Sequence, residues 1–234
     1  ANTPYGNHPA EEILTMTRYM LRFMEEKGVK ALLVACNTIS CLIDQYRDEM
    51  SCPVLSVVQA GADAVKDLDV HKVGVISTCF TASTHCYPDL IGKAAPDKVV
   101  ISHGCPDLAN VVERNVGRPE GQALIDADVQ KNLEGLVRDE QIECCVLGCT
   151  HYPLLTDIIG DIMGPGVTLI NASEEGAWEL KRTLRSMDLL APEKQAGQAT
   201  LCASDQPEDF GALASYFLRE TLSHPVRPVD IDRY

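Results

Sequence analysis

The sequence has few aromatic and few basic residues. Only 5% of its 234 residues are aromatic while 45% are hydrophobic, so we expect an aliphatic core. Lysine and arginine total 20 against 34 aspartates and glutamates, which gives a formal net charge of −14. Nucleic acids and anionic membranes bind to basic faces, and we therefore expect neither as a partner. An acidic small molecule would need local donors, such as backbone N–H groups at helix N-termini, to overcome the overall charge.

The sequence also lacks a long apolar run and a regular cysteine framework. No stretch has the length and apolar character of a membrane span, and no signal peptide is recognisable. The ten cysteines do not show the spacing of a small disulfide-stapled domain, and several fall in expected buried strands. Free buried cysteine behaves as a small hydrophobe, so we expect reduced thiols and a cytoplasmic location.

Strand-like and helix-like apolar patterns alternate along the chain, which predicts an α/β fold with a mostly parallel sheet. Strands are expected over residues 29–35, 53–58, 72–77, 98–102, 142–147, 167–170 and 200–203. Helices are expected over residues 9–27, 38–50, 60–68, 81–91, 107–115, 121–139, 153–163, 173–186 and 208–222. An α/β domain usually opens with a strand, whereas this pattern opens with a helix, so we expect that N-terminal residues are missing from the chain.

Two cysteines occupy matching positions in the two halves of the sequence. Cys36 stands in Ala-Cys-Asn-Thr and Cys149 in Gly-Cys-Thr-His, and each follows an expected strand and precedes a helix. Ligands of open α/β sheets bind at the carboxyl ends of strands, and a thiol at a helix N-terminus is more acidic than a free one. Two such thiols facing one cleft suit a racemase without a cofactor, in which one removes a proton from carbon and the other returns a proton to the opposite face.

A structural role is the simpler explanation for a single cysteine at the end of a strand. We give such a residue roughly a one-in-ten chance of being catalytic, because most are small buried hydrophobes. The paired motifs reverse this expectation for Cys36 and Cys149, and we interpret the other eight cysteines as structural. Cys144 and Cys145 should point to opposite faces of their strand, which argues against a metal shared between them.

Five segments carry a resemblance to a known family. They are Pro4-Tyr5-Gly6, Ala35-Cys36-Asn37-Thr38, Gly74 to Thr78 with Thr81, Cys105-Pro106 followed by Val112-Glu113, and Leu147-Gly148-Cys149-Thr150-His151-Tyr152-Pro153-Leu154-Leu155. Over nearly its whole length the chain resembles the aspartate/glutamate racemase superfamily and, within it, the glutamate racemases. His151 supports the glutamate branch, since the aspartate racemases usually carry Glu at this place.

The resemblance implies two pseudo-symmetric lobes, each a mostly parallel sheet flanked by helices, with the active site in the cleft between them. It implies a first lobe of residues 1–60 and 174–234, which carries Cys36, and a second lobe of residues 61–173, which carries Cys149. The implied reaction interconverts L- and D-glutamate without cofactor or metal and supplies D-glutamate for peptidoglycan synthesis. A homodimer is the implied assembly.

The resemblance also assigns roles to individual residues. It implies that Cys36 and Cys149 are the two acid/base thiols and that Glu113 and His151 assist them. The residues implied in substrate binding are Tyr5, Gly6, Asn37, Thr38, Thr78, Thr150 and His151. The family's N-terminal strand and its Asp-Ser-Gly turn, whose Asp and Ser contact the substrate amine, have no counterpart in this sequence.

Two alternatives remain open at this point. One is a racemase for another amino acid, aspartate first, and the pairing of Thr150 with His151 argues against it. The other is a non-catalytic homologue that binds a small acid or a protein partner. A true N-terminus without the Asp-Ser-Gly turn would favour this alternative, whereas the presence of both cysteines argues against it.

Overall fold

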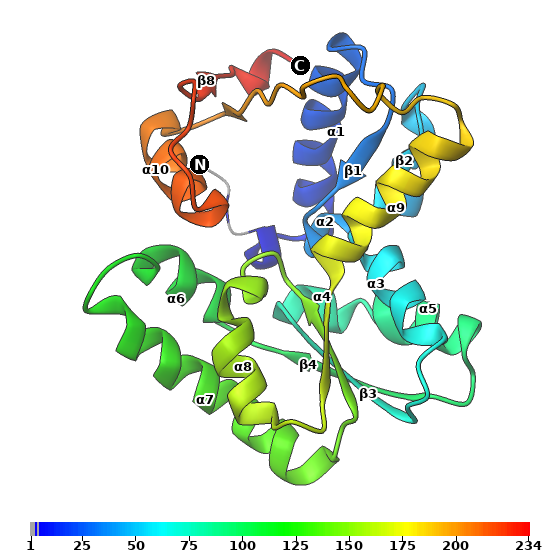
Figure 1. Ribbon diagram of the computed structural model, residues 1–234, viewed down its shortest axis with the longest axis vertical. Coiled ribbons are helices and arrows are strands. Elements are labelled where there is room, and N and C mark those ends of the chain that lie inside the picture. Colours follow the sequence, from blue (N-terminus) through cyan, green and yellow to red (C-terminus); the bar gives the residue numbers. More distant parts are fainter. Residues whose placement is uncertain (1–2, 4) are drawn as a thin grey trace.

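The computed structural model describes residue 3 and residues 5–234 (Figure 1). Within these residues the strands form parallel sheets in the orders β4-β3-β5-β6, β1-β2 and β7-β8. The strands are β1 Leu32–Val34, β2 Val54–Ser56, β3 Lys72–Ser77, β4 Val99–Gly104, β5 Cys144–Gly148, β6 Thr168–Asn171, β7 Cys202–Ala203 and β8 Arg227–Pro228.

The α-helices are α1 Ala10–Glu26, α2 Asn37–Ser40, α3 Val57–Lys66, α4 Cys79–Ser83, α5 Cys86–Ala94, α6 Leu108–Asn115, α7 Gly121–Glu140, α8 Thr156–Met163, α9 Ala172–Ser186 and α10 Pro207–Leu218. The 3₁₀ turns are η1 Tyr5–Asn7, η2 Ile43–Gln45, η3 Arg47–Glu49, η4 Tyr152–Leu155 and η5 Ile231–Arg233. Among the described helices, none combines the length and the apolar character needed to cross a membrane.

The four-stranded sheet is buried on both faces. Side chains alternate along β5, so Cys144 and Val146 join a cluster with α3 and α5, whereas Cys145 and Leu147 join a cluster with α6, α7 and α8. Figure 1 shows these two groups of helices on either side of β3 and β4. The opposite orientation predicted for Cys144 and Cys145 is therefore confirmed.

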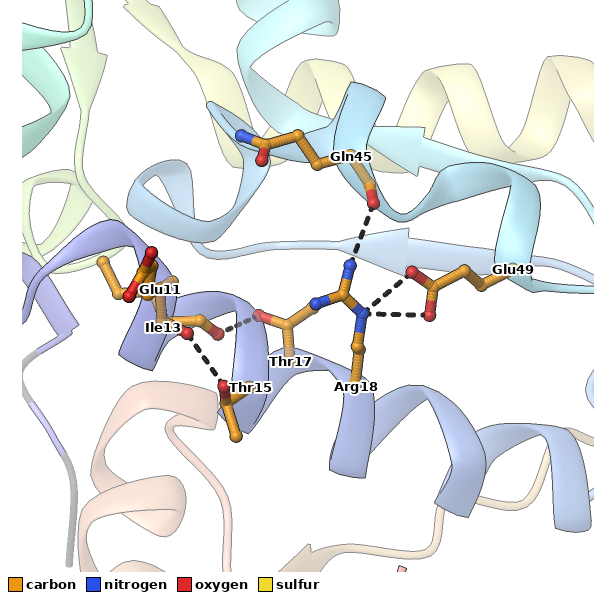
Figure 2. A network of polar contacts seen from close by, with 7 residues as sticks. All are labelled: Glu11, Ile13, Thr15, Thr17, Arg18, Gln45 and Glu49. Carbon is orange, nitrogen blue, oxygen red and sulfur yellow. Dashed lines mark hydrogen bonds and ion pairs between the residues drawn. The ribbon is translucent and has the colours of Figure 1, made fainter.

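The two-stranded sheet β1-β2 packs against α1 through a separate cluster that includes Ile13, Leu21 and Tyr46. Figure 2 shows how polar contacts hold α1 in place: Arg18 Nε donates to Glu49 Oε1 at 2.9 Å and its Nη2 donates to the Gln45 carbonyl at 3.3 Å. These contacts join α1 to the turns that follow α2.

The C-terminal segment returns to α1 at the end of the chain (Figure 1). The rings of Phe23 and Tyr234 meet edge to face, with centroids 5.6 Å apart, and Arg22 donates to the Tyr234 carbonyl. Residues of β7, β8 and α10 line part of a cleft.

Three of the predicted helices are divided or end early in the structure. The helix expected over residues 38–50 ends at Ser40 and continues as η2 and η3, where Tyr46 is buried and its hydroxyl donates to the Ile39 carbonyl at 3.1 Å. The helix expected over residues 81–91 is divided by His85, whose φ of 56° lies in the left-handed region. The last one, expected to reach residue 222, ends at Leu218 before Arg219 at φ 53°.

The α/β class with parallel sheets, helices on their faces and two lobes is confirmed. The lobe boundaries stay a prediction. The boundary expected after residue 60 falls inside α3, whose Val58, Ala62 and Val65 all pack on the four-stranded sheet.

Candidate active site

Three strands end at one cleft of about 1850 Å³. Cys36 lies two positions after β1, Thr78 directly after β3 and Cys149 directly after β5, and all three line the cleft. Because the strands within each sheet are parallel, their carboxyl ends present residues at a common edge. The cleft also receives every other residue proposed for the site, namely Tyr5, Gly6, Asn37, Thr38, Glu113, Thr150 and His151.

On one side of the cleft, Cys149 is the first member of a chain of three polar groups. Its Sγ lies 3.6 Å from His151 Nδ1, and His151 Nε2 lies 3.5 Å from Glu113 Oε2. Burial alone would lower the pKa of His151, but its contacts with Cys149 and Glu113 outweigh burial and raise the pKa to about 9. The contact with His151 in turn lowers the pKa of Glu113. A protonated His151 is thus held beside the Cys149 sulfur.

On the other side, Cys36 has a different environment. It precedes the first residue of α2, and burial raises its pKa to about 11, although backbone N–H groups of Ile39 and Thr38 partly offset this effect. The charge of Cys149 also raises the pKa of Cys36, so the two sulfurs interact electrostatically across the cleft. Cys36 is therefore expected to be a protonated thiol at neutral pH. The more acidic thiol predicted from its place at a helix N-terminus is wrong for Cys36, because burial outweighs the effect of the helix.

Asn37 carries an amide group that points to a ligand. Its side chain is 2% exposed, and its Oδ1 accepts a hydrogen bond from the Tyr87 hydroxyl at 2.7 Å. Its Nδ2 has no hydrogen-bond partner among the described residues. An orphaned buried donor is costly, so this amide favours an acceptor brought by a bound molecule.

A hydroxyl cluster lies beside Asn37 and joins α2 to α4. Thr38 Oγ1 is 3.2 Å from Thr78 Oγ1 and 3.4 Å from Thr81 Oγ1, and Thr78 Oγ1 also accepts the Thr81 backbone N–H at 3.2 Å. The structure agrees with the prediction that Thr81 belongs to the first turn of a helix. It also shows that the same residue positions the two threonines that line the cleft.

Tyr5 and Gly6 approach the cleft from the short turn η1. A Cβ atom built on Gly6 would lie 3.1 Å from Thr78 Cβ, so a side chain at this position would press against Thr78. The pKa of Tyr5 is raised by burial and by the charge of Cys36. Thr150, half-buried after Cys149, completes the residues that line the cleft. Pro4, which belongs to the Pro-Tyr-Gly motif, lies outside the described residues.

Two supporting residues were not anticipated from the sequence. Tyr87 orients Asn37 from a helix on the other sheet, and nothing in its local sequence distinguishes it from an ordinary core tyrosine. Gly148 ends β5 where an added Cβ would lie 2.9 Å from the Ile76 carbonyl oxygen, so it allows Cys149 to reach the cleft. Across the described part of the chain, no three His, Cys, Asp or Glu side chains come together as a metal site would require.

Comparisons with known proteins agree with this arrangement. Residues 3–180 match the family model described as Asp/Glu/Hydantoin racemase. A glutamate racemase of Mycobacterium ulcerans is 37% identical over 233 residues, which cover 97% of this chain and 84% of that protein. A glutamate racemase of Lactiplantibacillus plantarum is 35% identical over 191 residues, or 81% of this chain and 68% of that protein.

Solved structures show the same similarity. The glutamate racemase isoform RacE1 of Bacillus anthracis superposes with a TM-score of 0.90 at 33% identity, over 97% of this chain and 84% of that one. The glutamate racemase of Francisella tularensis, solved in complex with D-glutamate, superposes with a TM-score of 0.86 at 28% identity, over 99% of this chain and 85% of that one.

Proposed function

Because this chain belongs to the Asp/Glu/Hydantoin racemase family, we propose that it racemises glutamate with Cys36 and Cys149 as the two acid/base groups. The observation that carries this proposal is the pair of unlike thiols at one cleft, one beside a protonated histidine and the other in surroundings that keep it protonated. In each direction the reaction needs one thiolate as base and one thiol as acid, and the unlike surroundings suit Cys149 as the base and Cys36 as the acid in one direction.

In each direction of the reaction, one thiol acts as the base and the other as the acid. In one direction the thiolate of Cys149, stabilised by the His151 imidazolium, takes the α-proton of glutamate, and the thiol of Cys36 donates its proton to the opposite face of the carbon. The reverse direction exchanges the two roles. Glu113 keeps His151 charged and oriented, so its role is to position the histidine, and it does not touch the reacting carbon.

Hydrogen-bond donors around the cleft would stabilise the negative charge that develops on the substrate in the transition state. The unpartnered Nδ2 of Asn37 is fixed by the bond from Tyr87 and suits the α-carboxylate, and the hydroxyls of Thr38, Thr78 and Thr150 add further donors. Removing one preorganised donor of this kind costs about 3–4 kcal/mol of transition-state stabilisation. We assign the backbone N–H groups of Tyr5 and Gly6 to the side-chain carboxylate.

We also infer the biological setting. D-glutamate made by this reaction would supply peptidoglycan synthesis, as the resemblance implies, and the ten free cysteines fit the reducing cytoplasm. We infer a homodimer, and the 49% exposed side chain of Trp178 makes its surroundings on α9 a candidate for the interface.

The test is the circular dichroism of L-glutamate incubated with the protein and no added cofactor. We expect the optical signal to decay with the wild type, and the rate to fall about 10³-fold or more for Cys36→Ala and for Cys149→Ala, because each leaves the reaction without one acid/base group. Serine at either position is a poorer base and should also slow the reaction by orders of magnitude.

Cys52→Ala is the matched control, since Cys52 is a half-buried thiol outside the cleft, and this variant should keep the wild-type rate. A wild-type signal that stays constant with glutamate but decays with aspartate would assign another substrate. Constant signals with both, together with D-glutamate protecting the fold against heat, would favour the non-catalytic alternative.

A further inference from the structure

A second pair of cysteines meets outside the reacting thiols. Cys41 Sγ and Cys86 Sγ lie 2.6 Å apart, although 45 positions separate them in the chain. Cys41 follows the last residue of α2 beside the small sheet, and Cys86 is the first residue of α5 on the large sheet. Both are free and half-buried. A shift of about half an ångström would bring the sulfurs to the length of a disulfide bond.

The two thiols differ in acidity in the way that an oxidisable pair requires. The hydrogen bond from Cys41, with a smaller contribution from Thr84, lowers the pKa of Cys86. The same hydrogen bond, together with burial, raises the pKa of Cys41. Cys86 also stands at the N-terminus of α5, where the helix dipole favours a thiolate. Cys86 is therefore the nucleophile of the pair, and Cys41 is placed to resolve its oxidised form.

We propose that Cys41 and Cys86 form a reversible disulfide when the protein meets a hydroperoxide. The Cys86 thiolate attacks one peroxide oxygen, the O–O bond breaks, and Cys86 becomes a sulfenic acid while the departing oxygen is protonated to water or an alcohol. The Cys41 sulfur then attacks the Cys86 sulfur, the S–O bond breaks, and the released hydroxide takes the Cys41 proton to form water. Two thiols lose two electrons and one peroxide gains them.

The bond would tie the segment after α2, beside the small sheet, to α5 on the large sheet. Cys41 directly follows the short helix that carries Asn37 and Thr38, and Cys86 is adjacent to Tyr87, which donates a hydrogen bond to Asn37. A covalent link at this point restrains the α2 segment relative to the large sheet. We therefore expect the oxidised protein to racemise glutamate more slowly. This expectation rests on the proposed function, but the formation of the disulfide does not.

The experiment treats the whole protein with a small excess of hydrogen peroxide and counts thiols after unfolding. We expect the loss of two of the ten thiols and their recovery with dithiothreitol. Trypsin digestion without reduction should yield a linked pair of peptides, residues 31–47 and 73–93. Fragmentation must place the bond at Cys41 and Cys86, because these peptides also contain Cys36 and Cys79. The midpoint of thermal unfolding should rise by about 4–10 °C.

Cys41→Ser and Cys86→Ser should each abolish the linked peptides, and Cys52→Ser, which changes another half-buried thiol, should keep them. No linked peptide in the wild type, or a link that runs through Cys36 or Cys79, would overturn the proposal. The disulfide is detected by mass, independently of racemase activity. Formation of the disulfide in a protein without racemase activity would contradict only the proposed function. An active protein that never forms the disulfide would contradict only this inference.

Discussion

At the scale of single residues, the two proposed acid/base thiols are made unequal by their neighbours. Cys36 is protonated because its surroundings exclude water, which raises its pKa to about 11. Cys149 faces a histidine whose pKa is raised to about 9 by Cys149 itself and by Glu113. In the proposed mechanism, Cys36 is therefore the group that can donate a proton, and the charged His151 lies beside the Cys149 sulfur.

Replacing Glu113 by glutamine should lower the pKa of His151 toward its ordinary value of 6.5, because the neutral amide no longer favours the imidazolium. The racemisation rate of this variant at pH 8 should be roughly tenfold lower than that of the wild type, since the His151 ring would be mostly deprotonated at that pH. NMR titration of the His151 ring measures the shift. Glu12→Gln, which changes the carboxylate beside His8 on α1, is the control and should leave the His151 titration unchanged.

The ion pair of Glu113 and His151 makes the free energy of unfolding depend on pH, and the two pKa shifts set the direction of that dependence. The folded-state pKa of His151 is raised, so its contribution is complete below pH 6.5 and disappears as the pH rises through about 9. The pKa of Glu113 is lowered, so its contribution is complete above pH 4.5 and disappears at lower pH. The difference in unfolding midpoint between wild type and Glu113→Gln should therefore be largest between these limits. A difference that grows above pH 9 would contradict the ion pair.

At the scale of elements, side-chain caps set where several helices begin. Ser56 and Asn171 end their strands and Thr78 directly follows one, and each accepts a backbone N–H from the first turn of the next helix. These starts could be predicted to within a few residues because the cap and the apolar pattern are local. The division of residues 81–91 was not predictable, because it depends on the left-handed turn at His85.

Asn171→Ala should lower the free energy of unfolding by about 1 kcal/mol, because the Asn171 side chain accepts N–H groups of both Ser173 and Glu174 at the start of α9. The expected fall in the unfolding midpoint is about 2–4 °C. Differential scanning calorimetry measures it, with Ser173→Ala as control, since Ser173 contributes only its backbone to this cap. Racemisation should be unaffected because Asn171 lies outside the cleft lining. Equal midpoints for wild type and Asn171→Ala would show that the cap contributes nothing.

At the scale of the whole molecule, a protein with a net charge of −14 is proposed to bind an anion. The overall field opposes the approach of glutamate, and the fixed donors of the cleft must compensate at short range. Added salt screens the field over distances beyond about 8–10 Å but affects contacts within the cleft less.

The KM for L-glutamate should therefore fall about two- to threefold when the ionic strength rises from low values to physiological ones, while kcat stays nearly constant. Initial rates across a sodium chloride series measure both constants. A KM that rises with salt would show that local positive charge, with His151 as the first candidate, governs binding more strongly than the net charge does.

The sequence by itself determined the alternation of strands and helices, the placement of Cys36 and Cys149 at strand ends, and the family. Each of these depends on local patterns of apolar residues and on short motifs. Only the tertiary structure decided which distant side chains meet: His151 with Glu113, Tyr87 with Asn37, and Cys41 with Cys86. Local patterns report whether a side chain is buried, but its partner depends on how the two sheets pack, and sequence spacing carries no record of that packing.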